Sequence, residues 1–447
     1  MRRRVPACVV LALWGTSVSL AAQAIPLIPT TAAPTQTNAS GSPRPELTLQ
    51  GSSSGGYDQN TSAALAAAGT ANPLFRPSST HLGGDLQLQY TVPGTRVNFA
   101  AGGGTSFRMY RADSFLLASH SAVVGVSAAV TPHLTVQSTA IATYAPPFQY
   151  SLFPSLDPSG LGQASLSPFD SVLSAHHVLS YGAGGGLSYR PTKRSSFVLD
   201  YDFRDVSTDN RVYGGRTQYA SGAYMRNIAK GLGVRLGYRY QLTEFVDRTT
   251  GARTPVRADN YDIGLDYGLS RGLSLSRSTS LSFRFGAAAL DYGHARRLQV
   301  VGNANLTQQL GRRWSLGGGY NRGLNFVDGF GVPVFADAAT LRLTGRLTRR
   351  ISARGTFGYS YGGIDDLSST ARLHARRATF RIQTALTRSL DAFAQYSYYR
   401  HAFPDTLQLA PGVPAIFSRQ GVSVGLSFSV PLVGGRNARR PVLPVLP

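Results

Sequence analysis

The sequence predicts an all-β fold, a transmembrane antiparallel up-and-down β-barrel of about 18 strands, with about 16 as the lower bound. Three observations predict it: an export signal at the N-terminus, segments in which apolar and polar residues alternate, and connections that are short and long in turn. An even number of strands returns the chain to the side of the membrane on which it started. We therefore expect both termini in the periplasm.

The first 24 residues, MRRRVPACVVLALWGTSVSLAAQA, have the composition of a secretory signal peptide. Three arginines precede an apolar run, and small residues suited to cleavage follow at Ala22 and Ala24. A twin-arginine signal at Arg2 and Arg3 is the alternative, but the usual spacer before the apolar run is missing. The single cysteine, Cys8, lies within this segment, so we expect no disulfide and no cysteine metal site in the mature chain.

The rest of the chain divides into three parts. Residues 25–44 are rich in proline, threonine and alanine without periodicity, which predicts a flexible periplasmic leader. Residues 45–431 carry the barrel pattern, and residues 432–447 are expected to form a periplasmic tail. No stretch after the signal reaches the roughly 18 consecutive apolar residues of a membrane helix, which excludes a helical inner-membrane bundle.

Composition favours strands and argues against nucleic-acid binding. Glycine (49), tyrosine (22) and phenylalanine (21) are abundant while only 15% of residues are charged, as suits short aromatic strands. The formal net charge of +22 would ordinarily raise the possibility of a nucleic-acid partner. The arginines, however, are spread singly along the strands and the chain is exported, so we expect no nucleic acid.

Alternation with a period of two marks the strands, and each marked segment is long enough to cross a bilayer when tilted, which takes about 9 to 11 residues. The clearest segments are 196–206, 232–243, 260–270, 279–290, 340–348 and 421–430.

Short and long connections between these segments alternate along the chain. The short ones are 92–96, 131–133, 191–195, 227–231, 311–313, 348–350 and 387–389, and the long ones are 58–80, 145–175, 207–215, 244–257, 324–337, 363–373 and 402–417. Short periplasmic turns and long outer loops are typical of outer-membrane barrels. A soluble propeller of four-stranded blades would lack this rhythm, whereas a β-sandwich would share only the alternation.

Residue parity assigns each side chain to a face, because apolar positions should meet lipid and polar positions the lumen. The positions expected outside are Phe197, Leu199, Tyr201, Phe203, Tyr261, Ile263, Leu265 and Tyr267, and those expected inside include Asp200, Asp202 and Arg204. Trp314, Tyr320, Tyr359 and Tyr361 fall near strand ends, where aromatic girdles lie.

Lumenal charges form two predicted groups. If the loop 244–257 closes its hairpin symmetrically, Arg239 lies opposite Asp262 and Arg235 opposite Asp266. In the simplest interpretation, such cross-strand ion pairs only stabilise the barrel wall. Arg284 is a further candidate pore-lining residue.

The second group is a stripe of arginines on three neighbouring strands with no acid at lumenal parity. Its members are Arg342, Arg346, Arg354, Arg377 and Arg381. Like charges facing each other destabilise a sheet, so the stripe predicts a water-filled or anion-attracting wall. The alternative, left open, is that a loop with acids, such as Asp365 and Asp366 or the segment 145–175, folds inward and pairs with it.

Signatures of catalysis and cofactor binding are weak. The sequence has no HExxH and no GxSxG motif, and the glycine runs at 100–104 and 182–186 lack the helix of a phosphate-binding loop. Ser207, Asp209, His294 and His401 could form a hydrolase site at the barrel rim, as a minor alternative. We expect no enzyme activity, no cofactor and no metal.

The first barrel segment, ELTLQGSSSGGYDQN, resembles a family of outer-membrane β-barrel porins associated with exopolysaccharide production, whose first strand commonly ends in a Tyr-Asp-x-Asn turn. Tyr57, Asp58, Gln59 and Asn60 are similar to that turn. The chain departs from the usual outer-membrane ending, because residues follow Phe428, the last aromatic of the final strand. The resemblance implies a Gram-negative outer-membrane location.

Together these features predict a porin-like channel with a preference for anions. An outer-membrane component of exopolysaccharide export is the alternative. The expected partners are outer-membrane lipid and lipopolysaccharide, the barrel-assembly machinery, and small or anionic solutes or an acidic polysaccharide.

Overall fold

The structure is a computed structural model. It describes residues 45–61, 78–111, 115–149, 171–208, 214–229, 232–246, 253–269, 276–292, 295–325, 334–364, 372–403 and 415–434. The predicted signal peptide and leader lie outside the described residues, as does the predicted tail beyond residue 434. In the described part of the chain, no helix has the length and apolar character needed to cross a bilayer.

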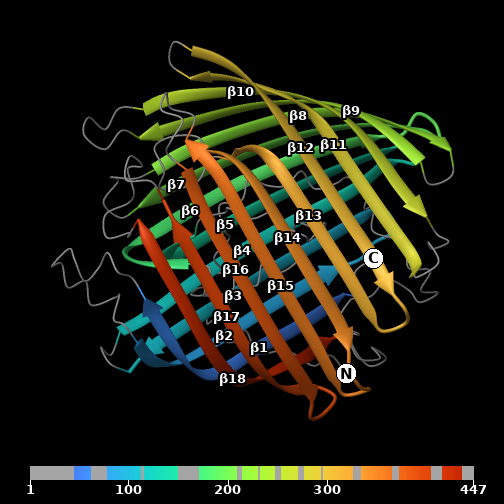
Figure 1. The fold of residues 1–447 in the computed structure, drawn as a ribbon. Coiled ribbons are helices and arrows are strands. Elements are labelled where there is room, and N and C mark those ends of the chain that lie inside the picture. The colour runs from blue at the N-terminus through green and yellow to red at the C-terminus, as the bar shows by residue number, and fades with distance from the viewer. Residues whose placement is uncertain are drawn as a thin grey trace, which may run out of the picture.

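The described residues form eighteen β-strands joined in one closed antiparallel sheet (Figure 1). The strands are β1 (Glu46–Thr61), β2 (Ser78–Val92), β3 (Val97–Tyr110), β4 (Phe115–Thr131), β5 (Leu134–Gln149), β6 (Ser171–Tyr189), β7 (Ser195–Thr208), β8 (Gly214–Ala229), β9 (Leu232–Val246), β10 (Arg253–Leu269), β11 (Ser276–Tyr292), β12 (Ala295–Leu310), β13 (Trp314–Asn325), β14 (Val334–Arg346), β15 (Ile351–Ile364), β16 (Arg372–Ala385), β17 (Leu390–Ala402) and β18 (Ile416–Val433).

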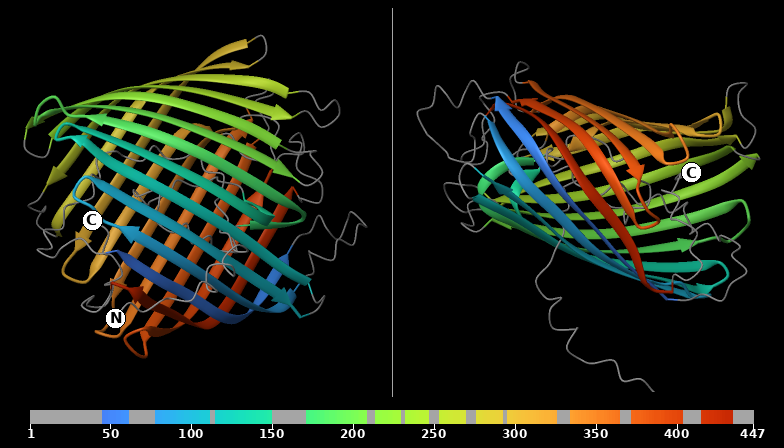
Figure 2. Two further views of the ribbon diagram at one scale, coloured as in Figure 1. Left: turned by 180° about the vertical axis from the view of Figure 1, so that it is seen from behind. Right: turned by 90° about the horizontal axis from the view of Figure 1, so that it is seen from below.

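Each strand pairs with its neighbours in chain order, and β1 closes the sheet by pairing with β18. In Figure 2 the strands of the near and far walls cross at a steep angle, as expected when strands tilt to close a barrel. The predicted up-and-down antiparallel barrel and its strand number are therefore confirmed.

Alternation along the strands separates an outward apolar face from an inward polar one. In β7, Phe197, Leu199 and Tyr201 remain about half exposed, whereas Val198 between them is buried. Tyr261 and Ile263 of β10 are exposed in the same way. These predicted outward positions are confirmed, and the side chains of Leu265 and Tyr267 lie outside the described part. A continuous apolar outer surface of this kind is suited to lipid.

The connections differ between the two ends of the barrel. At one end, here called the short-turn end, strands are joined by residues 93–96, 132–133, 190–194, 230–231, 311–313, 347–350 and 386–389. At the other, the long-connection end, they are joined by 62–77, 150–170, 209–213, 247–252, 326–333, 365–371 and 403–415. Residues 270–275 at the first end, and 111–114 and 293–294 at the second, depart from this pattern.

The predicted pairing of charges between β9 and β10 is wrong by two residues. The partners across the ladder are Asn260 for Arg239, Gly237 for Asp262, Gly264 for Arg235 and Gly233 for Asp266. The two strands continue to Val246 and Arg253, so the hairpin is centred one residue earlier than the loop 244–257 implies. A shift of two residues leaves every side chain on its predicted face.

Candidate pore-lining surface

Burial of the inner face changes along the barrel. Toward the long-connection end, inward side chains such as Ser360, Ser397 and His401 are fully buried. Toward the short-turn end, inward Arg346 and Arg354 are exposed. The part of the inner face that water reaches therefore lies mainly toward the short turns.

Five arginines occupy this inner face on three adjacent strands, and we call them the basic wall: Arg342 and Arg346 of β14, Arg354 of β15, and Arg377 and Arg381 of β16. The register places Arg354 directly opposite Arg381. The only acidic residue within the described β14, β15 and β16 is Asp337. It lies on the outward face, where its carboxylate is 3.2 Å from Arg322. These three strands thus present only positive charge to the lumen.

Two acids on other strands reach the edge of the basic wall, and sequence reasoning missed both. Asp391 of β17 accepts a 3.0 Å hydrogen bond from Gln383 Nε2, and Asp85 of β2 accepts one of 2.5 Å from Ser52 Oγ. Arg381 interacts electrostatically with both carboxylates. Its guanidinium carbon also lies 3.9 Å from the ring centroid of Phe393. Arg381 therefore has both acidic neighbours and an aromatic contact at the edge of the basic wall.

The inner face of β7 to β11 carries charges of both signs, and we call it the mixed wall. Its described charged residues are Asp200, Asp202, Arg204, Arg235, Arg239, Asp262 and Arg284. Asp262 lies 3.9 Å from Arg284, while the guanidinium of Arg239 lies over the ring of Tyr219 at 5.1 Å. The side chain of Asp266 is outside the described part. Acids and bases are interleaved here, so this wall is closer to neutral than the basic wall.

Glycines make room for the carboxylates of the mixed wall. A Cβ at Gly184 would lie 2.1 Å from Asp202 Oδ1, and one at Gly237 would lie 2.0 Å from Asp262 Oδ1. Each aspartate side chain therefore lies across the neighbouring strand at a position that has no side chain. The glycine run at 182–186 is explained by this close approach and not by phosphate binding.

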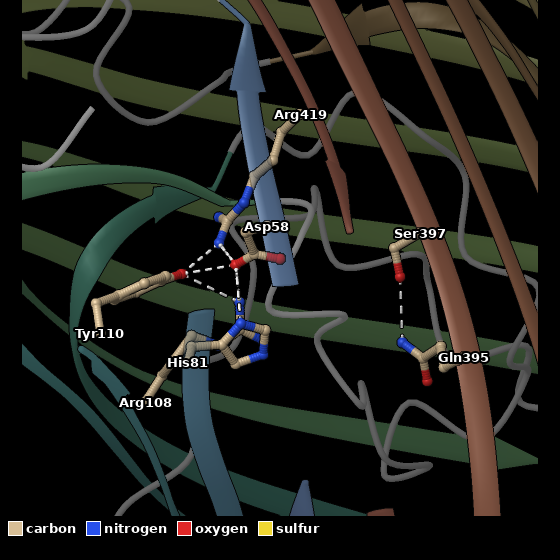
Figure 3. A network of polar contacts seen from close by, with 7 residues as sticks. All are labelled: Asp58, His81, Arg108, Tyr110, Gln395, Ser397 and Arg419. Carbon is tan, nitrogen blue, oxygen red and sulfur yellow. Dashed lines mark hydrogen bonds and ion pairs between the residues drawn. The ribbon is translucent and has the colours of Figure 1, made fainter. Parts of the chain in front are cut away.

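A third group of polar and charged side chains lies where the first strand, β1, pairs with the last strand, β18. We call it the seam cluster: Asp58 of β1, His81 of β2, Arg108 and Tyr110 of β3, and Arg419 of β18 (Figure 3). All five side chains are buried.

One carboxylate oxygen is the centre of the seam cluster. Asp58 Oδ2 accepts hydrogen bonds from Arg419 Nη2 at 2.6 Å, Arg108 Nη1 at 3.1 Å and Tyr110 Oη at 2.9 Å. His81 Nδ1 lies 3.5 Å from the same oxygen. The cluster joins the first three strands to the last one across the closure of the sheet.

The segment that resembles the exopolysaccharide-associated porins takes part in this closure. Asp58 points inward to the cluster, Tyr57 is exposed on the outer face, and Gln59 accepts a 2.7 Å hydrogen bond from Gln420 Nε2 of β18. Its described residues thus have a structural explanation in the pairing of β1 with β18.

The described members of the alternative hydrolase site do not come together. Ser207 lies at an outward position of β7, whereas His401 is buried on the inner face of β17 and stacks on Phe403 with ring centroids 4.2 Å apart. Asp209 and His294 lie outside the described residues. Among the residues that the structure describes, no group of three His, Cys, Asp or Glu side chains could hold a metal ion.

No protein-family model and no curated protein sequence matches this chain. Among solved structures, it is similar to Pseudomonas aeruginosa OccK2 (OpdF), with 11% identity over 87% of this chain and 98% of that one and a TM-score of 0.45. For Pseudomonas aeruginosa OpdO the identity is 14% over 87% and 97%, with a TM-score of 0.43. For the FrpB iron transporter from Neisseria meningitidis it is 7% over 87% and 82%, with a TM-score of 0.44. The fold assignment rests on the strand pairing itself.

Proposed function

We propose that this protein is an outer-membrane, porin-like channel whose lumen favours anions. The observation that carries the proposal is the basic wall: five inward arginines on three adjacent strands whose described residues present no inward acid. The apolar outer surface supports a place in the membrane, and the short-turn end would face the periplasm.

The geometry gives the arginines a long-range effect. A lumen lined by low-dielectric walls focuses the field of its charges and raises the local concentration of the opposite ion. Arg346 and Arg354 are exposed, so their charges act directly on water and solutes in the lumen. The mixed wall on other strands contributes both signs and would not cancel this field.

An 18-stranded closed sheet is wide enough for an aqueous passage. Inner-face side chains toward the long-connection end are buried, and in the proposal that end is the narrowest part of the passage. In the proposal, solutes are selected by size there and by charge at the basic wall.

The test is ion selectivity in planar lipid bilayers under a KCl gradient. We expect open channels whose reversal potential indicates preference for chloride. Changing Arg342, Arg346, Arg377 and Arg381 together to serine should move that potential toward preference for potassium. The matched control removes four arginines from the short turns: Arg312, Arg313, Arg349 and Arg350.

Two outcomes would overturn the proposal. Wild-type protein that inserts in folded form but never conducts would contradict a channel. An unchanged reversal potential in the folded quadruple variant, or an equal change in the control, would contradict selection by the basic wall.

Export of an acidic polysaccharide is the second candidate, and the resemblance of residues 57–60 favours it. A basic wall would attract a polyanion as it attracts a small anion. Acidic oligosaccharides of increasing length separate the two: for export, current block should become longer-lived with chain length, whereas for a small-solute channel oligomers above the size limit should leave the current unchanged.

A further inference from the structure

Arginines form a row on the outer face of the barrel, near the long-connection end. Arg372 and Arg376 of β16 and Arg400 of β17 are all exposed there. We call them the rim arginines. They share the outward face with Phe380 of β16 and Tyr396 of β17, which are 48% and 42% exposed and lie nearer the short turns. The strands that carry them lie side by side in Figure 1.

The register brings two of these positive charges together. Arg376 is directly opposite Arg400 across the β16–β17 ladder. Its other neighbour is Tyr359 of β15, whose ring centroid lies 5.6 Å from the Arg376 guanidinium carbon. Like charges at opposed positions destabilise a sheet. An anion that contacts both guanidinium groups would turn this repulsion into attraction.

The described residues of β15 to β18 supply no carboxylate to this outer surface, and the outward Asp337 of β14, opposite Tyr361, is paired with Arg322. Asp391 is the only acidic residue of β15, β16, β17 and β18, and it faces the lumen. Arg372 contacts Tyr361, over whose ring it lies at 5.3 Å and to whose hydroxyl it donates a hydrogen bond. Tyr361 and Tyr359 hold the guanidinium groups of Arg372 and Arg376 in place without neutralising them.

Elsewhere on the outer face, arginines at similar heights have acid partners. Arg216 lies 3.1 Å from Asp205, and Arg322 lies 3.2 Å from Asp337. Both of these arginines also lie over an aromatic ring, Phe203 and Phe335 respectively. Arg372 and Arg376 thus repeat the arrangement of an arginine over an aromatic ring, but no ion pair with a carboxylate accompanies it on their strands.

The height of the rim arginines fits the membrane surface. Strands rise about 3.3 Å per residue and tilt by about 40°, so Arg376 stands about 23 Å above Ala385 at the short-turn end. The apolar band of an outer-membrane barrel is about 25 Å tall. With the lower edge of that band at the level of Ala385, Arg376 and Arg400 lie at its upper edge, where headgroups begin.

We propose that Arg376 and Arg400, with Arg372 beside them, bind a phosphate group on the headgroup of an outer-leaflet glycolipid. Planar guanidinium groups donate paired hydrogen bonds to phosphate oxygens, and phosphate offers enough acceptors for two arginines at once. The apolar side chains below would contact the acyl chains. This proposal rests on the membrane orientation in the proposed function, and not on conduction.

The test measures lipid binding to full-length protein in detergent by native mass spectrometry, with bisphosphorylated lipid A as the probe. In the variant Arg376→Gln/Arg400→Gln we expect the affinity to fall by about tenfold or more, since each arginine near an anionic lipid contributes appreciably. The control Arg349→Gln/Arg350→Gln removes the same charge from an exposed short turn and should bind like the wild type.

A second measurement uses only the wild-type protein, so it tests the proposal even if the double variant does not fold. Dephosphorylated lipid A should bind the wild type about as weakly as the phosphorylated lipid binds the double variant. Inorganic phosphate at millimolar concentration should not displace the lipid.

Three results would overturn the proposal. They are equal lipid affinity of wild type and folded double variant, equal binding of phosphorylated and dephosphorylated lipid, and displacement by inorganic phosphate, which would indicate a site for free anions. Conductance of the double variant in neutral lipid should equal that of the wild type, so failure here is distinguishable from failure of the channel proposal.

Discussion

The basic wall and the seam cluster both place arginines on the inner face of the barrel, yet their surroundings differ. In the seam cluster, Arg108 and Arg419 converge on one carboxylate and are excluded from water. In the basic wall, Arg354 is exposed and faces another arginine. The same residue type is structural in one place and available to solutes in the other.

Burial explains the difference. A charge removed from water costs several kcal/mol unless a partner and further hydrogen bonds compensate it, so the seam arginines require Asp58. A charge that stays hydrated does not need a protein partner, and its field extends into the lumen. Position along the strand therefore decides the role of an arginine in this barrel.

The largest predicted effect is the loss of the Asp58 carboxylate. Asp58→Asn keeps the shape but removes the charge shared by two buried arginines, and it should lower the free energy of unfolding by about 3 to 5 kcal/mol. Urea unfolding in lipid vesicles measures this change. Asp391→Asn, at an inward carboxylate that is only partly buried, is the control and should cost less than about 1 kcal/mol. Equal losses of unfolding free energy in Asp58→Asn and Asp391→Asn would contradict the distinction between the seam cluster and the basic wall.

A smaller effect is expected for Tyr110→Phe, which keeps the ring and removes the hydroxyl that donates to Asp58 and accepts from Arg419. Loss of these bonds in a buried cluster should cost about 1 to 2 kcal/mol in the same unfolding assay. Tyr90→Phe, beside Phe99 in the β2–β3 hairpin, is the matched control and should be close to neutral. A loss of unfolding free energy no larger than that of the control would mean that the Tyr110 hydroxyl does not stabilise the pairing of β1 with β18.

The smallest stability effect is expected in the basic wall. Arg381→Gln removes the repulsion from Arg354 but also the contact with Phe393 and the attraction to Asp85 and Asp391. Because these contributions oppose each other, the free energy of unfolding should change by less than about 1 kcal/mol. A loss as large as that of Asp58→Asn would show that the basic wall, too, is a structural ion network.

The comparison also shows what the sequence can and cannot predict. Period-two alternation located the strands, because lipid and lumen impose opposite demands on adjacent residues, and it placed Arg342 and Arg354 on one face. It did not fix register between β9 and β10, since the loop gives no signal for where pairing ends. Alternation predicts the face of the sheet on which a side chain lies, whereas its partner on the neighbouring strand depends on the length of the hairpin.

The seam cluster was not predicted from the sequence for a different reason. Asp58 and Arg419 are 361 positions apart, and no local pattern links them. One signal was available: an even barrel must pair its first strand with its last, and both residues are charged at inward positions near the same end. Asp85, which approaches Arg381 from β2, could be found only once the walls were placed in space.

The most direct test of the central claim measures the local potential at the basic wall by thiol modification. In a Cys8→Ala background, Thr356→Cys places a thiol on the inner face opposite Arg342, and Ser127→Cys places a reference thiol on the inner face of β4 between Asn98 and Gln137. Each is reacted with an anionic and a cationic methanethiosulfonate reagent at low salt. The ratio of anionic to cationic rates should be about tenfold higher at position 356 than at 127 and should fall toward equality in 1 M salt. Equal ratios at the two positions in low salt would contradict an anion-attracting wall.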